Sequence, residues 1–271
     1  MVEMVSKRHR LQFIARASRS FDRKTRVLVS RLRPALESAI PWWIAAWLVL
    51  SAWKVSGALG EGPSGSDVAY TVLPYLLIAL APVVALRLAE SAFCDRSTAW
   101  TPRTRLARIG RWREVAVETA REHRLFGPVG FLASLTIGML LNVVLRSGEF
   151  LLAVPAIGTA APGWAQALFL SMAFETMAMN FLYMVCFVMA LRAVPAFPRM
   201  LVATWIVDLA FQLRTATIVG SHEALPPDVA IALTGVLQGN VQKVCISIFI
   251  WLPYLLLSKR VNLTYRHRLA R

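Results

Sequence analysis

The chain has 271 residues, of which 57% are hydrophobic and 17% charged, and its formal net charge is +15. Most of its 30 Lys and Arg residues lie between long stretches with almost no charge, so the basic character does not indicate nucleic-acid binding. Apolar stretches of about 18 residues or more predict transmembrane helices, since about 20 residues at 1.5 Å rise cross the hydrocarbon layer. We therefore expect an all-α, polytopic transmembrane helix bundle of about six spans.

Residues 1–40 form a basic segment that we predict to be cytoplasmic. The first apolar run starts only near Pro41, which argues against a cleaved signal peptide. Before it, one set of positions recurs at alternating steps of three and four, which predicts a basic amphipathic helix on an anionic leaflet. A charged, partly disordered tail is the alternative. The positions are Leu11, Ile14, Ser18, Phe21, Thr25, Leu28 and Leu32.

Residues 41–90 predict a hairpin of two transmembrane helices. The first span runs from about Pro41 to Ala58 and is flanked by tryptophans, which favour the membrane interface. A Gly- and Ser-rich turn leads to the second span, from about Val68 to Leu88. The second span contains Pro74 and Pro82, which are tolerated where neighbouring helices satisfy the freed carbonyls.

Residues 91–126 form a second basic segment, predicted to be a cytoplasmic helix or loop. Thr101 is a candidate N-cap, and Pro102 would occupy the first helical position. This helix could lie on the membrane surface or bind a partner, and a solvated helix is the alternative. Its predicted apolar stripe is Leu106, Ile109, Trp112 and Ala116.

Residues 127–271 predict a four-helix transmembrane domain. The spans are about Val129 to Leu145, Gly163 to Leu191, Pro198 to Val219, and Val229 to Leu257. Alternate loops differ sharply in their content of Lys and Arg, so the positive-inside rule predicts that both termini are cytoplasmic. Only four basic residues fall on or near the opposite side: Lys54, Arg146, Arg214 and Lys243.

Polar residues inside the predicted spans are functional candidates, because such groups are costly at membrane depth. The set comprises Glu175 and Asn180 in the fourth span, Asp208 and Gln212 in the fifth, and Lys243 in the sixth. We expect Lys243 to pair with Glu175 or Asp208. Such a pair would either hold the helices together or line a cavity for an ion, a proton or a polar headgroup.

Motifs that would indicate catalysis or metal binding do not occur. The sequence has no G-x-S-x-G, H-E-x-x-H or Walker-type pattern, and its three cysteines are isolated. We therefore predict no enzyme, no cofactor and no metal site. The four scattered histidines, His9, His123, His222 and His267, are not at ligand spacing.

An ordered set of short motifs runs through the C-terminal half. It comprises the glycine-rich Gly127 to Leu141, then Phe174, Glu175 and Asn180, then Phe197 and Pro198, and finally Trp251, Pro253, Tyr254, Ser258, Arg260, Val261 and Thr264. This order resembles a family of small bacterial four-helix inner-membrane proteins classed as a domain of unknown function. The resemblance covers about Leu125 to Arg268 and implies a topology and a bacterial inner membrane, but no activity. Phe131 stands where that family usually has tryptophan, and the two N-terminal spans are additional.

The terminal motif predicts a corner at the membrane interface. Pro253 removes a backbone donor, so the last turns of the helix can bend, and Ser258 can bond to a freed carbonyl. Lys259 and Arg260 would then meet phosphate groups of lipids or a partner, and a simple stop-transfer anchor is the alternative. The full predicted corner is Trp251, Pro253, Tyr254, Ser258, Lys259, Arg260 and Thr264.

The leading functional prediction is a non-enzymatic structural or accessory subunit of the membrane. Its expected partners are the lipid bilayer with its anionic headgroups and a membrane protein. Nucleic acid is not an expected partner. The alternative is a small transporter or channel-like component with a polar site around Glu175, Asp208 and Lys243. A membrane enzyme for lipid-linked substrates has little support, since no catalytic constellation appears.

Overall fold

The computed structural model describes residues 2–57, 65–94, 111–222 and 225–270, with side chains from residue 20 onward. Six helices in this part of the chain are long and apolar enough to cross a membrane, which confirms the predicted fold class. In α1 the candidate span is Ser20–Ser56. The six helices are α1 (Val2–Ser56), α2 (Gly65–Ala92), α4 (Phe131–Ala153), α5 (Gly163–Leu191), α6 (Phe197–Gly220) and α7 (Pro227–Leu257).

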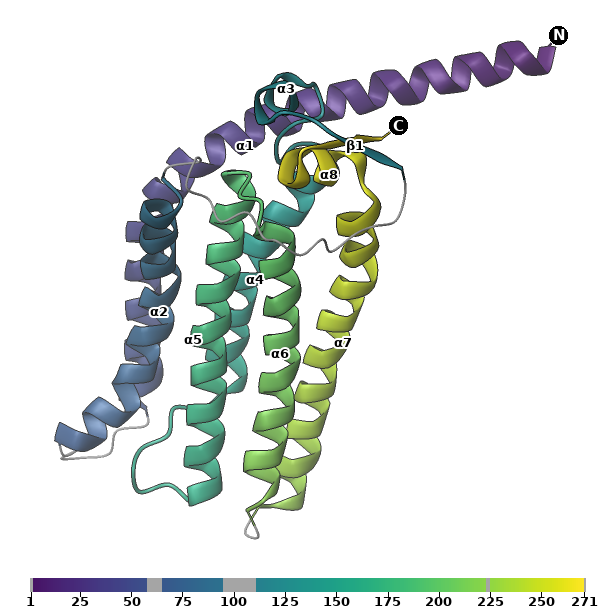
Figure 1. Cartoon of the computed structure of the whole chain (residues 1–271). Helices are drawn as coiled ribbons and strands as arrows, with labels where there is room; N and C mark the ends of the chain where they lie inside the picture. Colours follow the sequence, from purple (N-terminus) through teal and green to yellow (C-terminus); the bar gives the residue numbers. More distant parts are fainter. Residues whose placement is uncertain (1, 58–64, 95–110, 223–224, 271) are drawn as a thin grey trace.

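Helices α2, α4, α5, α6 and α7 run side by side, and α1 lies along α2 at one edge (Figure 1). Helix α5 packs against α2, α4 and α6, so it forms the centre of the bundle, while α7 packs mainly on α6. The central helix is the most buried, and the outer helices are the least buried. In the most apolar 18 residues of each helix, 61% of the residues of α5 are buried, against 11% in α1 and in α7. The two outer helices therefore have faces that the described part of the chain does not cover.

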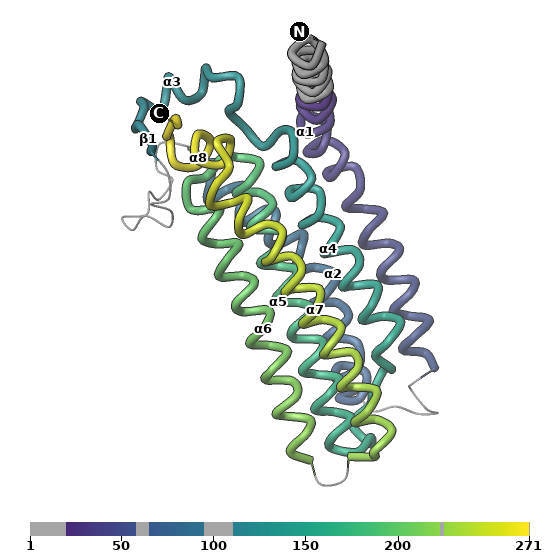
Figure 2. Tube along the Cα trace, turned by 90° about the vertical axis from the view of Figure 1, so that its right-hand side faces the viewer, coloured from purple at the N-terminus to yellow at the C-terminus, as the bar shows by residue number. Residues whose placement is uncertain are grey.

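Helix α1 is continuous across the predicted boundary at residue 40 and contains both Pro34 and Pro41. Salt bridges to α2 accompany this stretch: Arg33 to Glu90 at 2.8 Å, and Glu37 to Arg87 at 2.6 Å. The basic segment and the first span are thus parts of one long helix (Figure 2).

The second basic segment differs from its prediction where the structure describes it. Thr101, Pro102, Leu106 and Ile109 lie outside the described residues. Trp112 lies in strand β1 (Trp112–Glu114), which pairs antiparallel with β2 (Arg268–Ala270). Helix α3 (Val117–Glu122) starts only after Ala116, so the predicted helix through Trp112 and Ala116 is wrong. The C-terminal tail supplies backbone partners from far along the chain, and this pairing overrides the local helical pattern.

The short elements gather at one end of the bundle. Helix α8 (Lys259–Arg266) lies there with α3 and the β1–β2 pair (Figure 1). Part of α1 reaches the same end, because Thr25 accepts a hydrogen bond from the backbone N–H of Gly130 at 2.8 Å. The largest core cluster lies between α4, α5, α6 and α7 and is closed at this end by Val261 and Tyr265 of α8.

Candidate functional site

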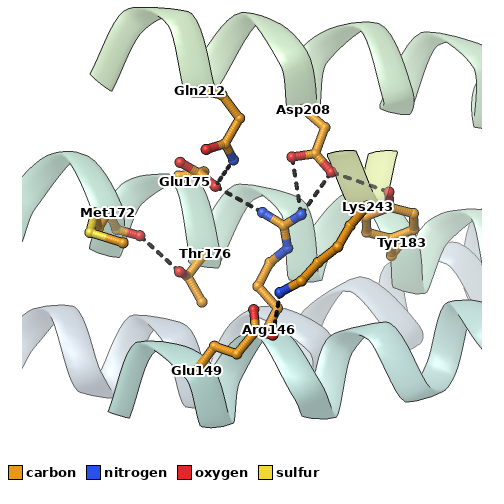
Figure 3. Close-up of polar contacts among 9 residues, drawn as sticks. All are labelled: Arg146, Glu149, Met172, Glu175, Thr176, Tyr183, Asp208, Gln212 and Lys243. Atoms are coloured by element: carbon orange, nitrogen blue, oxygen red, sulfur yellow. Dashed lines mark hydrogen bonds and ion pairs between the residues drawn. The ribbon is translucent and has the colours of Figure 1, made fainter. Parts of the chain in front are cut away.

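A buried ion-pair cluster joins three helices. Arg146 on α4 donates to Glu175 on α5, with 2.9 Å between Nη1 and Oε1. It also donates to Asp208 on α6, with 2.7 Å between Nη2 and Oδ2 (Figure 3). The side chains are only 13%, 6% and 0% exposed, respectively. One guanidinium thus bridges carboxyl groups from two neighbouring helices.

Neutral polar groups complete the cluster. The Tyr183 hydroxyl donates to Oδ2 of Asp208 at 3.2 Å, and Nε2 of Gln212 donates to Oε1 of Glu175 at 2.5 Å. Helical geometry explains this gathering, because residues four apart, such as Asp208 and Gln212, share one face. Tyr183 lies eight residues after Glu175 on α5 and so also stands close to the same face.

The cluster lies at membrane depth. Arg146 is 15 residues from the Phe131 end of α4, and Glu175 is 16 residues from the Leu191 end of α5. At 1.5 Å per residue both lie about 22–24 Å from that end, inside a hydrocarbon layer of about 30 Å. With one guanidinium and two carboxyl groups, the cluster is electrically neutral when one carboxyl group holds a proton.

Lys243 does not belong to this cluster, so its predicted pairing with Glu175 or Asp208 is wrong. Its Nζ instead lies 2.5 Å from Oε1 of Glu149 on α4, and both side chains are more than half exposed. The predicted third span ended at Leu145, which placed Arg146 outside the membrane. Helix α4 continues to Ala153, and Arg146 can lie inside because two carboxyl groups compensate its charge.

Sequence reasoning therefore missed the central residue of the site. The signal was present: apolar residues resume after Arg146 at Phe150, Leu151 and Leu152. A charge with apolar residues on both sides is typical of a span that contains it, rather than of a span end. Asn180, also predicted, is fully buried beside the cluster, and its Nδ2 donates to Ser147 Oγ at 2.8 Å.

Helix α7 presents a second polar group, but on its outer face. Gln238, Gln242 and Lys243 are exposed there. Within the described part of the chain, the side chains of the two glutamines make no hydrogen bond. Gly235 and Gly239 lie on the same stretch, and a Cβ atom added to either would meet nothing within 4 Å. We call these five residues the α7 polar face.

The predicted C-terminal corner is partly as expected. Trp251 and Tyr254 enclose Phe131, with ring centroids 4.7 and 5.0 Å away, and they form an aromatic cluster at the end of the bundle. Pro253 lies in the last turns of α7, and Ser258 separates α7 from α8.

Arg260 is not available to lipid phosphates, contrary to the prediction. It is 8% exposed, and its Nη2 donates to Asp22 on α1 at 2.9 Å. Its neighbour Lys259 is exposed. Thr264 accepts a hydrogen bond from the N–H of Gly127 at 3.1 Å, so this part of the corner joins α8 to the entrance of α4.

Two groups on the same end have shifted acid–base behaviour. Burial, reinforced by Arg268 and Arg199, lowers the pKa of Arg266 to about 10. Burial also lowers the pKa of His267, with Arg121 acting in the same direction and Glu118 opposing it. The charged form of each group is therefore less favourable in the folded protein than in water, chiefly because the group is partly buried.

Comparison with protein-family models, curated proteins and solved structures finds no match in any of the three. The resemblance of residues 125–268 to a family of unknown function thus remains a prediction.

Proposed function

We propose that the protein is a non-enzymatic accessory subunit of the bacterial inner membrane, which binds a membrane-protein partner through the α7 polar face. The observation that carries the proposal is the exposure of Gln238, Gln242 and Lys243 on a helix long and apolar enough to span the membrane. Lys243 is 14 residues from Leu257, or about 21 Å from that end of α7.

Exposed amides and charges at this depth favour a second helix. Hydrocarbon offers no hydrogen-bond partner, so such groups are stabilised by polar side chains of an adjacent transmembrane segment. Gly235 and Gly239 have the small-xxx-small spacing that allows close approach of two backbones. Small residues and hydrogen-bonding groups on one stretch together suit a transmembrane helix as the occupant.

The buried cluster supports a structural role for the other intramembrane charges. Arg146, Glu175 and Asp208 are satisfied by one another and by Tyr183 and Gln212. The transporter alternative required Lys243 to share a site with the two carboxyl groups. Its salt bridge to Glu149 separates it from them, which favours the accessory role.

The orientation proposed is that both termini face the cytoplasm. It rests on the excess of Lys and Arg in the segments around residues 1–40, 87–124 and 259–271. The structure supports a common side, since Asp22 near the start of the chain bonds to Arg260 near its end.

The test is copurification of the tagged full-length chain from native membranes, followed by quantitative mass spectrometry. The informative variant is the double substitution Gly235→Leu and Gly239→Leu, which blocks the approach of another helix to α7. Ala210→Leu is the control, because Ala210 is exposed on α6 and lies off the α7 polar face.

We expect a stoichiometric membrane protein with the wild-type chain and the control, and its loss with the double variant. A partner that is retained by the double variant would contradict the assignment to α7. Recovery of only a second copy of this chain, or of no membrane protein, would contradict the accessory role.

A further inference from the structure

An apolar cavity of about 180 Å³ lies between four helices. All of its lining side chains are hydrophobic, and they come from α1, α2, α4 and α5. The Trp43 indole, the one lining side chain with a polar hydrogen, donates it to the carbonyl of Ala79 at 3.0 Å. Representative lining residues are Ile40, Trp43, Pro82, Leu86, Val143 and Met184.

A second cavity, of about 250 Å³, lies next to the first, toward the end of the bundle that carries α8. Leu36 and Leu86 line both cavities. The second cavity is lined by charged side chains as well: Arg33 of α1, Glu90 of α2, and Arg192, which directly follows α5.

The two cavities are arranged like the two parts of a lipid, with the charged cavity nearer the helix end than the apolar cavity. Leu86 and Pro82 lie 6 and 10 residues before Ala92, about 9 and 15 Å along α2 from its end. Glu90 lies in the last turn of α2. The charged cavity is therefore at headgroup level, and the apolar cavity is inside the hydrocarbon layer.

The charges at headgroup level suit a phosphate. Two guanidinium groups and one carboxylate line the charged cavity, so the local balance is positive. Arg33 pairs with Glu90 at 2.8 Å, and Arg192 donates to the carbonyl of Phe93 at 3.2 Å, which leaves both with further N–H donors. Guanidinium groups bind phosphate oxygens through such parallel N–H bonds.

We propose that the two cavities form one binding site for a phospholipid. One acyl chain occupies the apolar cavity against Trp43 and Met184, and the phosphate lies at the end with Arg33 and Arg192. The bound lipid would fill the space between α1 and the rest of the bundle. This also accounts for the position of α1, which has few buried residues of its own along its span.

The first test counts phospholipids that stay on the full-length protein through detergent exchange, by native mass spectrometry. Val83→Trp fills the apolar cavity, because Val83 lines it. The matched control is Val84→Trp on the adjacent, exposed position of α2, 45% exposed. We expect about tenfold less retained lipid for Val83→Trp and wild-type retention for Val84→Trp, since several buried methylene groups lose their contacts. Equal retention in both variants would overturn the proposal.

A second pair of variants tests the charged end. Arg192→Gln removes a proposed phosphate ligand, while Arg113→Gln removes an exposed positive charge of β1 at the same end of the bundle. We expect reduced retention only for Arg192→Gln. Retention of a free fatty acid instead of a phospholipid, or equal loss in both variants, would contradict the headgroup assignment.

A measurement on the unaltered chain avoids any folding defect of Val83→Trp. The protein is placed in vesicles of phosphatidylethanolamine and phosphatidylglycerol that contain a lipid with a photoreactive acyl chain. Met184 is 4% exposed and lines the apolar cavity, so its labelling requires entry of the chain. Labelling confined to outward-facing residues such as Leu80 and Leu88 would overturn the proposal.

Discussion

Two groups of polar side chains lie at membrane depth in this protein, and they differ in how they are satisfied. The cluster around Arg146 is closed: three helices contribute, and each charge has a partner from another helix. The α7 polar face is open, with its two glutamines exposed and unbonded within the described residues. The charges of the closed group are paired within this chain, and the open group is the surface to which we assign the proposed partner.

The position of each helix in the bundle accounts for the difference. Helix α5 is central and packs against α2, α4 and α6, whereas α7 packs mainly on α6 and has an exposed outer face. Residue type therefore does not distinguish the roles of Glu175 and Lys243. Four substitutions test this difference between the two groups and the corner that joins the helices, and they follow in decreasing order of expected effect.

Arg146→Leu should be the most damaging of the four changes. It leaves two carboxyl groups buried without a cation, and loss of one member of a buried ion pair costs about 3–5 kcal/mol. Unfolding of the purified protein in mixed micelles would measure this free energy. The triple variant Arg146→Leu, Glu175→Gln and Asp208→Asn should recover much of the loss. A single variant as stable as the wild type would show that the cluster does not hold the helices together.

Gly130→Ala should have an intermediate effect at the corner where α1 meets α4. Gly130 has a φ of 65° and a ψ of −140°, which strains any other residue by about 1–3 kcal/mol. An added Cβ would also lie 2.6 Å from Oδ1 of Asp22, the partner of Arg260. Thermal unfolding should show the loss, with Gly138→Ala as a control because its Cβ meets nothing within 4 Å. Equal melting temperatures would contradict a tight corner.

Lys243→Leu should change the stability of the isolated chain by only about 1 kcal/mol or less, because exposed pairs and interhelical polar contacts contribute little. It should nevertheless weaken copurification of the proposed partner. A small change in stability together with weaker copurification would assign Lys243 to the open group rather than to the closed one. A stability loss as large as that of Arg146→Leu would mean that Lys243 belongs to the structural network after all.

The smallest effect should be a pH dependence at the end of the bundle. Burial lowers the pKa of His267 below its usual 6.5, so the unfolded segment binds the proton more readily than the folded one. The free energy of unfolding of this segment therefore has its full value above pH 6.5. It decreases as the pH falls through that value toward the pKa of His267 in the folded protein. Hydrogen exchange of residues 259–270, corrected for intrinsic rates, should rise on acidification. His267→Asn should remove this dependence, since Asn tolerates the left-handed backbone with φ 49°. An unchanged pH dependence in His267→Asn would assign it to another group.

The class of the protein and the number of its candidate spans could be predicted from the amino-acid sequence alone. A long apolar segment in a membrane forms a helix, because a helix satisfies all of its own backbone hydrogen bonds. The presence of a span could therefore be predicted without knowing which helices lie next to it. The same reasoning identified Glu175, Asn180, Asp208, Gln212 and Lys243 as costly residues inside those spans. It could say that they need partners, but not which partners.

Only the tertiary structure decided the pairings. Helical periodicity indicates which residues share a face, but not which helix lies against that face or at what relative height. This is why Arg146, rather than Lys243, stands between Glu175 and Asp208. It is also why Arg260 meets Asp22, a residue 238 positions away, and why Trp112 lies in a strand paired with the last residues described. Contacts so distant along the chain depend on the packing of whole helices, which no local pattern contains.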